Sequence, residues 1–397
     1  MSCTLVEKFI RHIRPFAPLL LLFATTALRA QTFRSLLSFD GTDGGLPYYV
    51  YLVQGADGQL YGTTNTDGEN GYGTVFKITT SGKITTIYSF CALSSCTDGA
   101  NPYAGLALGT NGNFYGTATS GGYSLGGTIF EITPSGTLTT LYTFCDISGC
   151  PNGANPESRL LLASNGNFYG TTTQGGDGDG TVFKITPAGK FTLLHTFNGL
   201  DGASPRNGAL LQGANGKLYG TTTYGGTNCS SDGGCGTVFE MTLSGTFRTL
   251  YNFCSLSRCA DGNTPYAGIV LASNGSFYGT TEFGGANGAN GTVFEMTTAG
   301  HLTTLYSFCV SNGCSDGDAP QAGLIQASDG NLYGTTGAGG AQGGGTIFQI
   351  TPTGTLTTLY DFCSVGDGNC FDGQGPSGGL QNSCKRDPIR HHLPGWN

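Results

Sequence analysis

The tripeptide Tyr-Gly-Thr returns six times along the chain at nearly even spacing. Its tyrosines are Tyr61, Tyr115, Tyr169, Tyr219, Tyr278 and Tyr333. A length of 397 residues would by itself allow two or three domains. A fixed period of about 54 residues outweighs that expectation, because self-similarity at one period is typical of repeat architectures. The sequence therefore predicts one array of similar units.

Each unit contains four short apolar segments separated by turn residues. A segment such as 104–108 is followed by an Asn-Gly or Asp-Gly pair, which favours a tight turn between antiparallel strands. Then come F/L-Y-G-T-T, a Gly-rich loop of variable length, G-T-V/I-F-x-I/M-T and finally L-T-T-L-Y-x-F. The 69 glycines fall between these segments and mark turns. Valine, isoleucine, threonine and aromatic residues favour strands, so we expect four antiparallel strands per unit.

A four-stranded sheet of this size cannot bury both faces alone, so the units must stack on one another. An all-β fold of the β-propeller type satisfies this requirement, and an open stack of sheets is the alternative. The array begins in phase with a fourth strand at 33–39 and reaches only a first strand near 378–380. We therefore expect a β-propeller with four-stranded antiparallel blades over residues 31–380, seven-bladed with an incomplete last blade. Six blades with spare strands at both ends is the alternative.

The two ends of the chain differ from the array. Lys8, Arg11 and Arg14 precede an apolar run over 18–28 and then Ala30, which predicts a signal peptide at 1–30. The apolar run is too short for a membrane span. Residues 381–397 lack the repeat and form an irregular, basic tail, for which a shifted or truncated reading frame is an alternative explanation.

Fourteen cysteines agree with an exported protein. Five pairs follow fourth strands and a sixth lies in another loop: Cys91/Cys96, Cys145/Cys150, Cys254/Cys259, Cys309/Cys314, Cys363/Cys370 and Cys229/Cys235. Local pairs in an exported chain predict disulfides, each contributing about 2 kcal/mol through loop-closure entropy. Metal thiolates are the alternative, but structural zinc needs four ligands at one point and each pair belongs to a different unit.

Together, the Y-G-T-T, G-T-V-F-x-I-T, T-T-L-Y-x-F and D-G-x-x-P segments resemble the GloVer tandem repeat over residues 33–380. That repeat occurs in exported bacterial proteins described as choice-of-anchor repeat proteins. The resemblance implies an exported, propeller-like repeat protein and no catalytic residue set. No C-terminal hydrophobic helix follows residue 380, which departs from an anchored protein.

Groups suited to catalysis are scarce. After the predicted signal peptide, the only histidines are His195, His301, His391 and His392. His195 replaces the tyrosine of a fourth strand, so we interpret it as a packing residue, and we expect His301 to be solvated. No histidine is placed for a Ser-His-Asp or Cys-His arrangement.

Carboxylates offer a second route to catalysis, since paired acids hydrolyse glycosides. One third-strand position carries Lys77, Glu131, Lys184, Glu240, Glu295 and Gln349. Alternating charge there indicates a solvated or inter-blade position. The aspartate of D-G-x-x-P is interpreted as a turn residue that bonds its own backbone. Calcium is the alternative at 177–179 and 316–318, but neither matches a complete calcium loop. We predict no catalytic residue, no metal and no cofactor.

Aromatic residues in variable loops are the best candidates for binding, because loops on a rigid scaffold carry function. Tyr72, Tyr123, Tyr224 and Phe283 lie between second and third strands. Tyr48, Tyr103 and Tyr266 directly follow the repeated proline. Stacking on a sugar or a partner side chain is the functional interpretation, and local loop packing is the alternative.

The sequence thus predicts a non-catalytic module that binds extracellular protein or carbohydrate. A secreted hydrolase or lyase of polysaccharides, or a purely structural surface protein, is the alternative. A formal net charge of -8 gives no basic footprint for nucleic acid. We expect a monomer, secreted, periplasmic or at the cell surface, with no membrane span once the signal peptide is removed.

Overall fold

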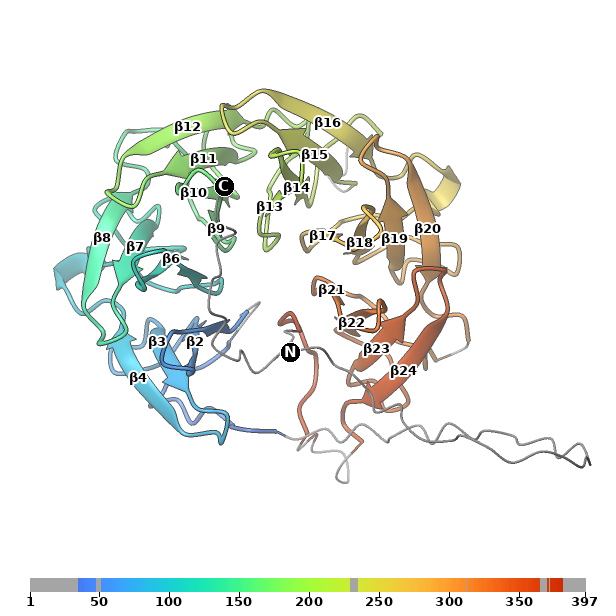
Figure 1. The fold of residues 1–397 in the computed structure, drawn as a ribbon, viewed down its shortest axis with the longest axis horizontal. Helices are drawn as coiled ribbons and strands as arrows, with labels where there is room; N and C mark the ends of the chain where they lie inside the picture. The colour runs from blue at the N-terminus through green and yellow to red at the C-terminus, as the bar shows by residue number, and fades with distance from the viewer. Residues whose placement is uncertain are drawn as a thin grey trace, which may run out of the picture. The chain divides into compact units, whose positions relative to one another are not determined.

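The computed structural model describes residues 35–47, 51–228, 235–311, 313–364, 370 and 372–380. They belong to one compact unit, Arg34–Gln381. Six four-stranded sheets stand around a common axis as the blades of a β-propeller (Figure 1). The predicted fold class and the four antiparallel strands per blade are confirmed.

Each blade is one consecutive stretch of chain. Blade 1 holds β1 (Val53–Gln54), β2 (Leu60–Thr64), β3 (Thr74–Ile78) and β4 (Ile84–Ser89). Blade 2 holds β5 (Ala107–Leu108), β6 (Phe114–Ala118), β7 (Thr128–Ile132) and β8 (Leu138–Thr143). Blade 3 holds β9 (Leu161–Leu162), β10 (Phe168–Thr172), β11 (Thr181–Ile185) and β12 (Phe191–Thr196). Blade 4 holds β13 (Leu211–Gln212), β14 (Leu218–Thr222), β15 (Thr237–Met241) and β16 (Phe247–Asn252). Blade 5 holds β17 (Val270–Leu271), β18 (Phe277–Thr281), β19 (Thr292–Met296) and β20 (Leu302–Ser307). Blade 6 holds β21 (Ile325–Gln326), β22 (Leu332–Thr336), β23 (Thr346–Ile350) and β24 (Leu356–Asp361).

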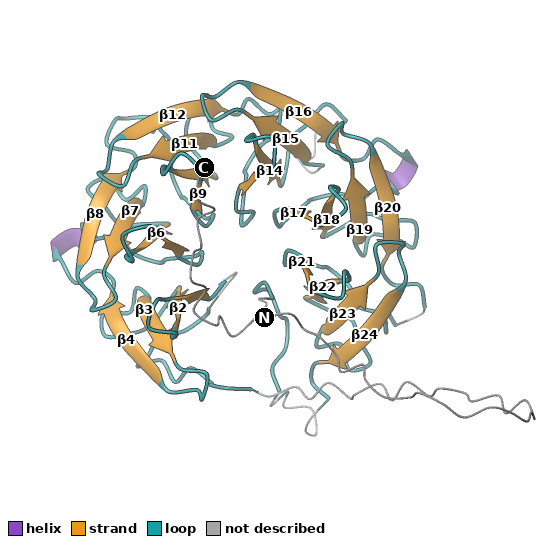
Figure 2. Cartoon of the chain, viewed as in Figure 1, coloured by secondary structure: helices purple, strands orange, loops and turns teal. Residues whose placement is uncertain are grey.

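The first strand of each blade lies nearest the axis and the fourth lies on the outside (Figure 1). Neighbouring strands pair antiparallel in sequence order. Every pairing of third and fourth strands contains a register shift, as between Val75 and Phe76 in blade 1, and such a bulge increases the local twist. Two short 3-10 helices, η1 (Ser94–Cys96) and η2 (Ser257–Cys259), lie in the connectors at the outer edge (Figure 2).

The core lies between blades, not within them. Tyr61 of blade 1 stacks on Phe114 of blade 2 with ring centroids 4.1 Å apart, and Phe90 meets the edge of Phe130 at 5.2 Å. Both pairs belong to one buried cluster that joins the two blades, and four similar clusters join the following blades. Large aromatic surfaces contribute most of the energy of such contacts, so each blade depends on its neighbour.

A threonine pair ties the second strand to the third inside the blades. Thr64 and Thr74 hydroxyls lie 2.8 Å apart and both side chains are buried. The same bond joins Thr172 to Thr181, Thr222 to Thr237, Thr281 to Thr292 and Thr336 to Thr346. In blade 2 alanine replaces the first threonine, and Thr128 Oγ1 is buried with no hydrogen-bond partner. Burying an unpartnered hydroxyl costs free energy, so blade 2 has a local defect.

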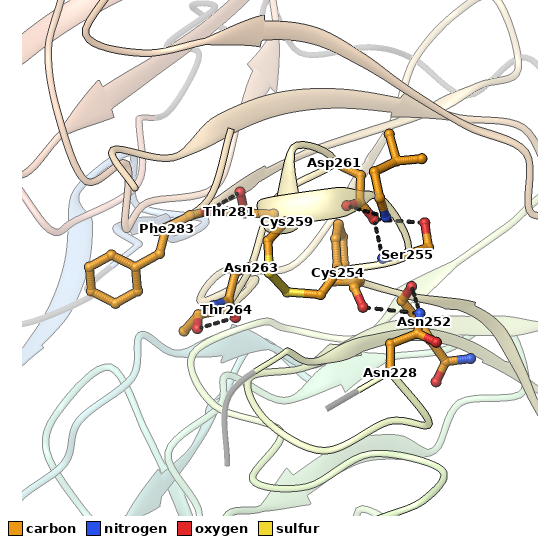
Figure 3. Close-up of a disulfide and its surroundings, with 12 residues drawn as sticks. Asn228, Asn252, Cys254, Ser255, Cys259, Asp261, Asn263, Thr264, Thr281 and Phe283 are labelled. Carbon is orange, nitrogen blue, oxygen red and sulfur yellow. Dashed lines mark hydrogen bonds between the residues drawn. A yellow bond between two sulfur atoms is a disulfide. The ribbon is translucent and has the colours of Figure 1, made fainter. Parts of the chain in front are cut away.

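Most connectors from one blade to the next are organised by the aspartate of D-G-x-x-P, and in the connector after blade 2 Asn152 takes its place and donates to the Tyr142 hydroxyl. Asp98 accepts hydrogen bonds from the Tyr88 hydroxyl at 2.7 Å and from the backbone N–H groups of Ala92 and Leu93. In the equivalent place Asp261 accepts from Tyr251 and from the loop after Cys254 (Figure 3). The interpretation of this aspartate as a residue bonding only its own turn is therefore too narrow. It joins the fourth strand to the cysteine loop.

Five of the predicted disulfides are present in these connectors: Cys91–Cys96, Cys145–Cys150, Cys254–Cys259, Cys309–Cys314 and Cys363–Cys370. Four of them close a loop next to the aspartate contact, and Cys145–Cys150 closes a loop next to Asn152. The sixth predicted pair includes Cys229, which lies outside the described residues, while Cys235 is buried. That pair stays a prediction.

The prediction of a seven-bladed ring is wrong, and the alternative of six blades holds. The predicted fourth strand at 33–39 is not a regular strand in its described part, because no third strand of its own blade lies beside it to form hydrogen bonds. Phe39 nevertheless packs on Phe76 of blade 1 with ring centroids 5.3 Å apart. The first strands are also shorter than predicted, with β5 beginning at Ala107 and β21 at Ile325. The predicted signal peptide and the tail at 381–397 lie outside the described residues.

We predict that Ala118→Thr stabilises the protein by about 1 kcal/mol, because it restores the threonine pair of the other blades to Thr128. The equivalent threonines are fully buried beside a glycine, as Ala118 is, so the space accepts the larger side chain. Urea unfolding measures the change. Thr172→Ala in blade 3 is the matched control and should destabilise by a similar or larger amount. A lower unfolding midpoint for Ala118→Thr would contradict the assignment.

His195 occupies the tyrosine position of blade 3, and its Nε2 lies 2.9 Å from Asp201 Oδ2. Its ring stacks on Phe247 of blade 4 at 3.8 Å, as Tyr142 stacks on Phe191 at 4.0 Å. The predicted packing role is present, and the aspartate contact adds to it. Burial lowers the pKa of His195, and the Asp201 carboxylate only partly opposes this.

His195→Tyr should reduce the acid sensitivity of the fold. Because the folded pKa of His195 is lowered, the unfolded chain binds more protons below about pH 6.5, and stability is lost as the pH falls through that region. Urea unfolding at pH 7.5 and pH 5.5 should show a larger loss for the wild type than for the variant. Tyr88→His, facing Asp98, is the reverse exchange and should add acid sensitivity. Equal losses in the wild type and His195→Tyr would exclude this role.

Candidate functional site at the centre of the ring

The residue after the repeated proline lies where each chain segment enters its innermost strand. This position carries Tyr103, Glu157, Arg206, Tyr266 and Gln321 in blades 2 to 6. The Tyr266 side chain of blade 5 lies close enough to Tyr103 of blade 2 to raise the pKa of Tyr103. Blades 2 and 5 are not neighbours, so this contact is made across the middle of the ring (Figure 1). The repeat therefore brings Tyr103, Glu157, Arg206 and Tyr266 together near the axis.

Charged groups from two blades meet in the same place. Arg206 Nε lies 3.8 Å from Glu157 Oε2, and Tyr266 lies close enough to the guanidinium to raise the pKa of Arg206. Arg206 Cζ lies 6.0 Å from the centroid of the Tyr224 ring, within reach of a cation–π interaction. Burial raises the pKa of Glu157, although Arg206 and a hydrogen bond from Thr173 oppose the shift. Burial and Tyr266 raise the pKa of Tyr103.

A second carboxyl group contacts the residue that follows the repeated proline of blade 6. Gln321 donates a hydrogen bond of 2.7 Å to Glu282 Oε1, which follows the second strand of blade 5. Burial raises the pKa of Glu282, and the negative charge of Asp318 adds to the shift. We call the following residues the central cluster: Tyr103, Glu157, Arg206, Tyr224, Tyr266, Glu282 and Gln321.

Some buried polar atoms of Arg206 and of the residue after it have no hydrogen-bond partner among the described residues. Arg206 Nε is buried and has no hydrogen-bond partner among the described residues. Both side-chain polar atoms of the next residue, Asn207, are also buried without a partner, and this side chain is 6% exposed. Buried polar groups are nearly always bonded in native proteins, so these atoms are suited to contacts with a polar ligand.

The innermost position of the blades follows shortly after. It carries a small residue at Gly105, Ala209, Gly268, Gly323 and Gly379, but Tyr51 and Arg159 in blades 1 and 3. Arg159 Cζ lies 5.2 Å from the centroid of the Tyr51 ring. The Tyr51 hydroxyl lies beside Gly323 of blade 6, and a Cβ on Gly379 would overlap the Tyr51 ring. The two large side chains therefore occupy the space that the small residues leave at the axis.

The four loop aromatics predicted as ligand contacts differ in their surroundings. Tyr224 belongs to the central cluster. Phe283 directly follows Glu282 and points away from the nearby disulfide (Figure 3). Tyr123 is 84% exposed and lines an outer groove of about 530 Å³ together with Leu93 and Tyr142. Tyr72 lies just before the third strand of blade 1.

The other candidate residues of the sequence are the charged residues of the third strands and the possible metal ligands. Glu131 accepts hydrogen bonds from Asn111, Asn113 and Tyr115 beside the first hairpin turn, and Glu240 pairs with Lys217 and Arg248. The third-strand charges thus support the hairpins within their own blades. His301 is exposed, while Tyr48, His391 and His392 lie outside the described residues. Within the described ranges no group of three or more His, Cys, Asp or Glu side chains is placed to hold a metal.

Sequence reasoning singled out Tyr103 and Tyr266 but missed Arg206, Glu157 and Gln321. A signal was present, since the residue after a repeated proline changes its chemistry from blade to blade while its surroundings stay constant. Packing between blades keeps most repeat positions the same from blade to blade. A position whose residue varies is not constrained by that packing. The replacement of glycine by Tyr51 and Arg159 was a second signal.

A comparison with curated proteins gives no match. One solved structure, provisionally described as a gluconolactonase, is 12% identical, with a TM-score of 0.43, and 83% of this chain and 93% of that chain are covered. Another, provisionally described as a glucose dehydrogenase-type oxidoreductase from Thermus thermophilus, is 14% identical, with a TM-score of 0.42 and coverage of 74% and 91%. At these values the likeness carries no argument about activity.

The sequence profile of the Gloeobacter/Verrucomicrobia repeat matches residues 22–231 and 224–386. Together the two matches span most of the chain, including all six blades. This chain therefore belongs to the Gloeobacter/Verrucomicrobia repeat family.

Proposed function

We propose that this protein is an exported, non-catalytic binding module and that the central cluster holds a carbohydrate. The observation that carries the proposal is the meeting of Tyr103, Arg206 and Tyr266 from three blades at the axis. Side chains held by separate rigid sheets lose little freedom when a ligand binds, which favours affinity.

The chemistry of the cluster suits a hydroxyl-rich ligand. Tyrosine rings offer apolar faces for stacking and a hydroxyl at the edge. Arg206 and Gln321 offer donors, while Glu157 and Glu282 offer acceptors. Arg206 Nε lies 3.8 Å from Glu157 Oε2 and has no hydrogen-bond partner among the described residues, so it can donate a hydrogen bond to a ligand oxygen. Sugars present alternating apolar faces and hydroxyl groups, which match this combination.

Export is supported by the five connector disulfides, because such bonds persist in oxidising compartments. We propose that residues 1–30 are removed as a signal peptide and that the chain works outside the cytoplasm as a monomer. A search of the described residues finds no helix that is both long and apolar enough to cross a membrane.

A glycan-degrading enzyme is the second candidate, favoured by Glu157 and Glu282. The two carboxyl groups come from different blades, and burial raises the pKa of each. A carboxyl group with a raised pKa is suited to act as a general acid on a glycosidic oxygen. Among the described residues, no contact joins the carboxyl groups of Glu157 and Glu282. We therefore place binding before catalysis.

Binding is tested with the purified mature chain on a glycan array, followed by calorimetry with the best ligand. Tyr266→Ala and Arg206→Gln should each weaken binding at least tenfold, because they remove a stacking face or a donor at the axis. Tyr123→Ala, on the outer groove, should change affinity less than twofold. Thermal unfolding of each variant checks that the ring is intact.

Loss of binding in Tyr123→Ala with none in Tyr266→Ala would place the ligand on the loop aromatics and contradict the central cluster. Binding of proteins but of no glycan on matched arrays would contradict the carbohydrate assignment.

The enzyme candidate is decided by product release from each glycan that binds. If the module is non-catalytic, reducing ends or unsaturated products stay at the level of a protein-free blank, and Glu157→Gln keeps most of the binding. Turnover by the wild type that falls at least a hundredfold in Glu157→Gln or Glu282→Gln, with binding retained, would replace the binding proposal by the enzyme.

A further inference from the structure

Among the described residues no four-stranded blade lies between blade 6 and blade 1, and two chain segments run there instead (Figure 1). One is 35–47, before blade 1, and the other is 372–380, after blade 6. Their contacts with the flanking blades can be compared with those that each blade makes with the next.

The segment before blade 1 makes the contacts of a fourth strand. Phe39 meets Phe76 at 5.3 Å and an interplanar angle of 69°, as Phe308 of blade 5 meets Phe348 of blade 6 at 5.3 Å and 66°. The Leu36 carbonyl lies against the turn glycine of blade 1. The same contact is made by the carbonyls of Ile87, Leu141, Leu194, Leu250 and Leu305 with the turn glycine of the following blade.

The segment after blade 6 makes the contacts of an approach to a first strand. Pro376 packs against Gly345, as Pro320 packs against Gly291 one blade earlier. The Gly375 N–H donates to the Gly344 carbonyl at 2.8 Å, and Thr335 Oγ1 donates to the Pro376 carbonyl at 3.4 Å. Gly379 then reaches Tyr51 at the axis. The first and fourth strand positions of a further blade are therefore marked, and the two positions between them are not filled by described residues.

The blade faces on both sides of these positions are less covered than their counterparts. Tyr333 and Ile347 of blade 6 are partly exposed. The equivalent tyrosines of blades 1 to 5 are at most 1% exposed, and the residues equivalent to Ile347 are all 0% exposed. Leu60 of blade 1 is partly exposed, while its equivalent Leu218 is 0% exposed. The two faces are the continuation of an interface that the chain forms five times elsewhere.

We propose that this position binds a two-stranded β-hairpin that carries the repeat's own second and third strands, supplied by another polypeptide. In every blade those strands are consecutive and joined by one loop, so the occupant is a hairpin. Its faces must offer an aromatic or leucine to Tyr333 and a tyrosine to Leu60, as F/L-Y-G-T-T does. An intact second copy of this chain has its hairpins bonded inside blades and cannot offer one without opening a blade.

The test uses a peptide that copies 329–351, the hairpin of blade 6, labelled for fluorescence anisotropy and titrated with the full chain. Saturable binding is expected. A peptide with Tyr333→Ser and Phe348→Ser should bind at least tenfold more weakly. In the receptor chain, Leu60→Glu and Ile347→Gln should each weaken binding at least tenfold. Leu256→Glu, on a connector loop where the side chain is 56% exposed, is the matched control and should leave binding unchanged.

No saturable binding overturns the proposal, and so does equal binding of the two peptides or equal binding by Leu60→Glu and the wild type. A photo-crosslinker at the Phe348 position of the peptide should label segments near β2 and β23. Labelling of other blades alone overturns the assignment. Light scattering that shows a dimer, broken by Leu60→Glu, would identify a second copy as the occupant and replace the hairpin. Protection of β2 and β23 from hydrogen exchange by residues 381–397, lost on deleting them, would identify the chain's own tail.

Discussion

Packing of one blade's apolar face on the next is the interaction on which the rest of this structure depends. Fully burying one large apolar side chain contributes about 1.5–3 kcal/mol, and each interface buries several, such as Tyr61, Phe114 and Phe130. A short-loop disulfide contributes about 2 kcal/mol. The blade interfaces therefore contribute more stability than the cysteine loops, which fix the connectors between blades. The connector after blade 3 supports this comparison. It has no disulfide, and it is held by the contact of His195 with Asp201 and by the stacking of His195 on Phe247.

Stacking around an axis explains where the candidate site lies. The innermost strands converge, so residues close to the axis must be small in most blades, as Gly105 and Gly268 are. Tyr51 and Arg159 fill the space that remains. The residue after the proline lies earlier in the chain than this innermost position, so its side chain does not have to be small. It therefore varies in chemistry while the repeat holds its backbone in place. A constant scaffold with a variable central position is suited to the evolution of binding, whatever the ligand.

The sequence contains most of the fold and little of the site. Strand number, order and direction follow from period and turn residues, because Asn-Gly pairs and alternating segments act locally. The number of blades could not be predicted in the same way. The segment 35–40 has the sequence pattern of a fourth strand, but it would form a regular strand only with a third strand beside it. Tyr103 and Tyr266 were noticed as aromatics after proline. Their contact was not foreseeable, because it joins residues three blades apart and depends on how the ring closes.

A stack of repeats always has two end faces that no further repeat covers, and here the ends are capped unequally. The N-terminal segment brings an aromatic ring, and Phe76 beneath it is only 3% exposed. The C-terminal segment brings Pro376 and Gly379, which are too small to cover a blade face, and Tyr333 and Ile347 stay partly exposed. Apolar surface beside free strand edges favours association with further strands. The blade 6 face is therefore the less covered of the two end faces. The residues that cover the equivalent face in the other blades indicate which side chains would pack on it.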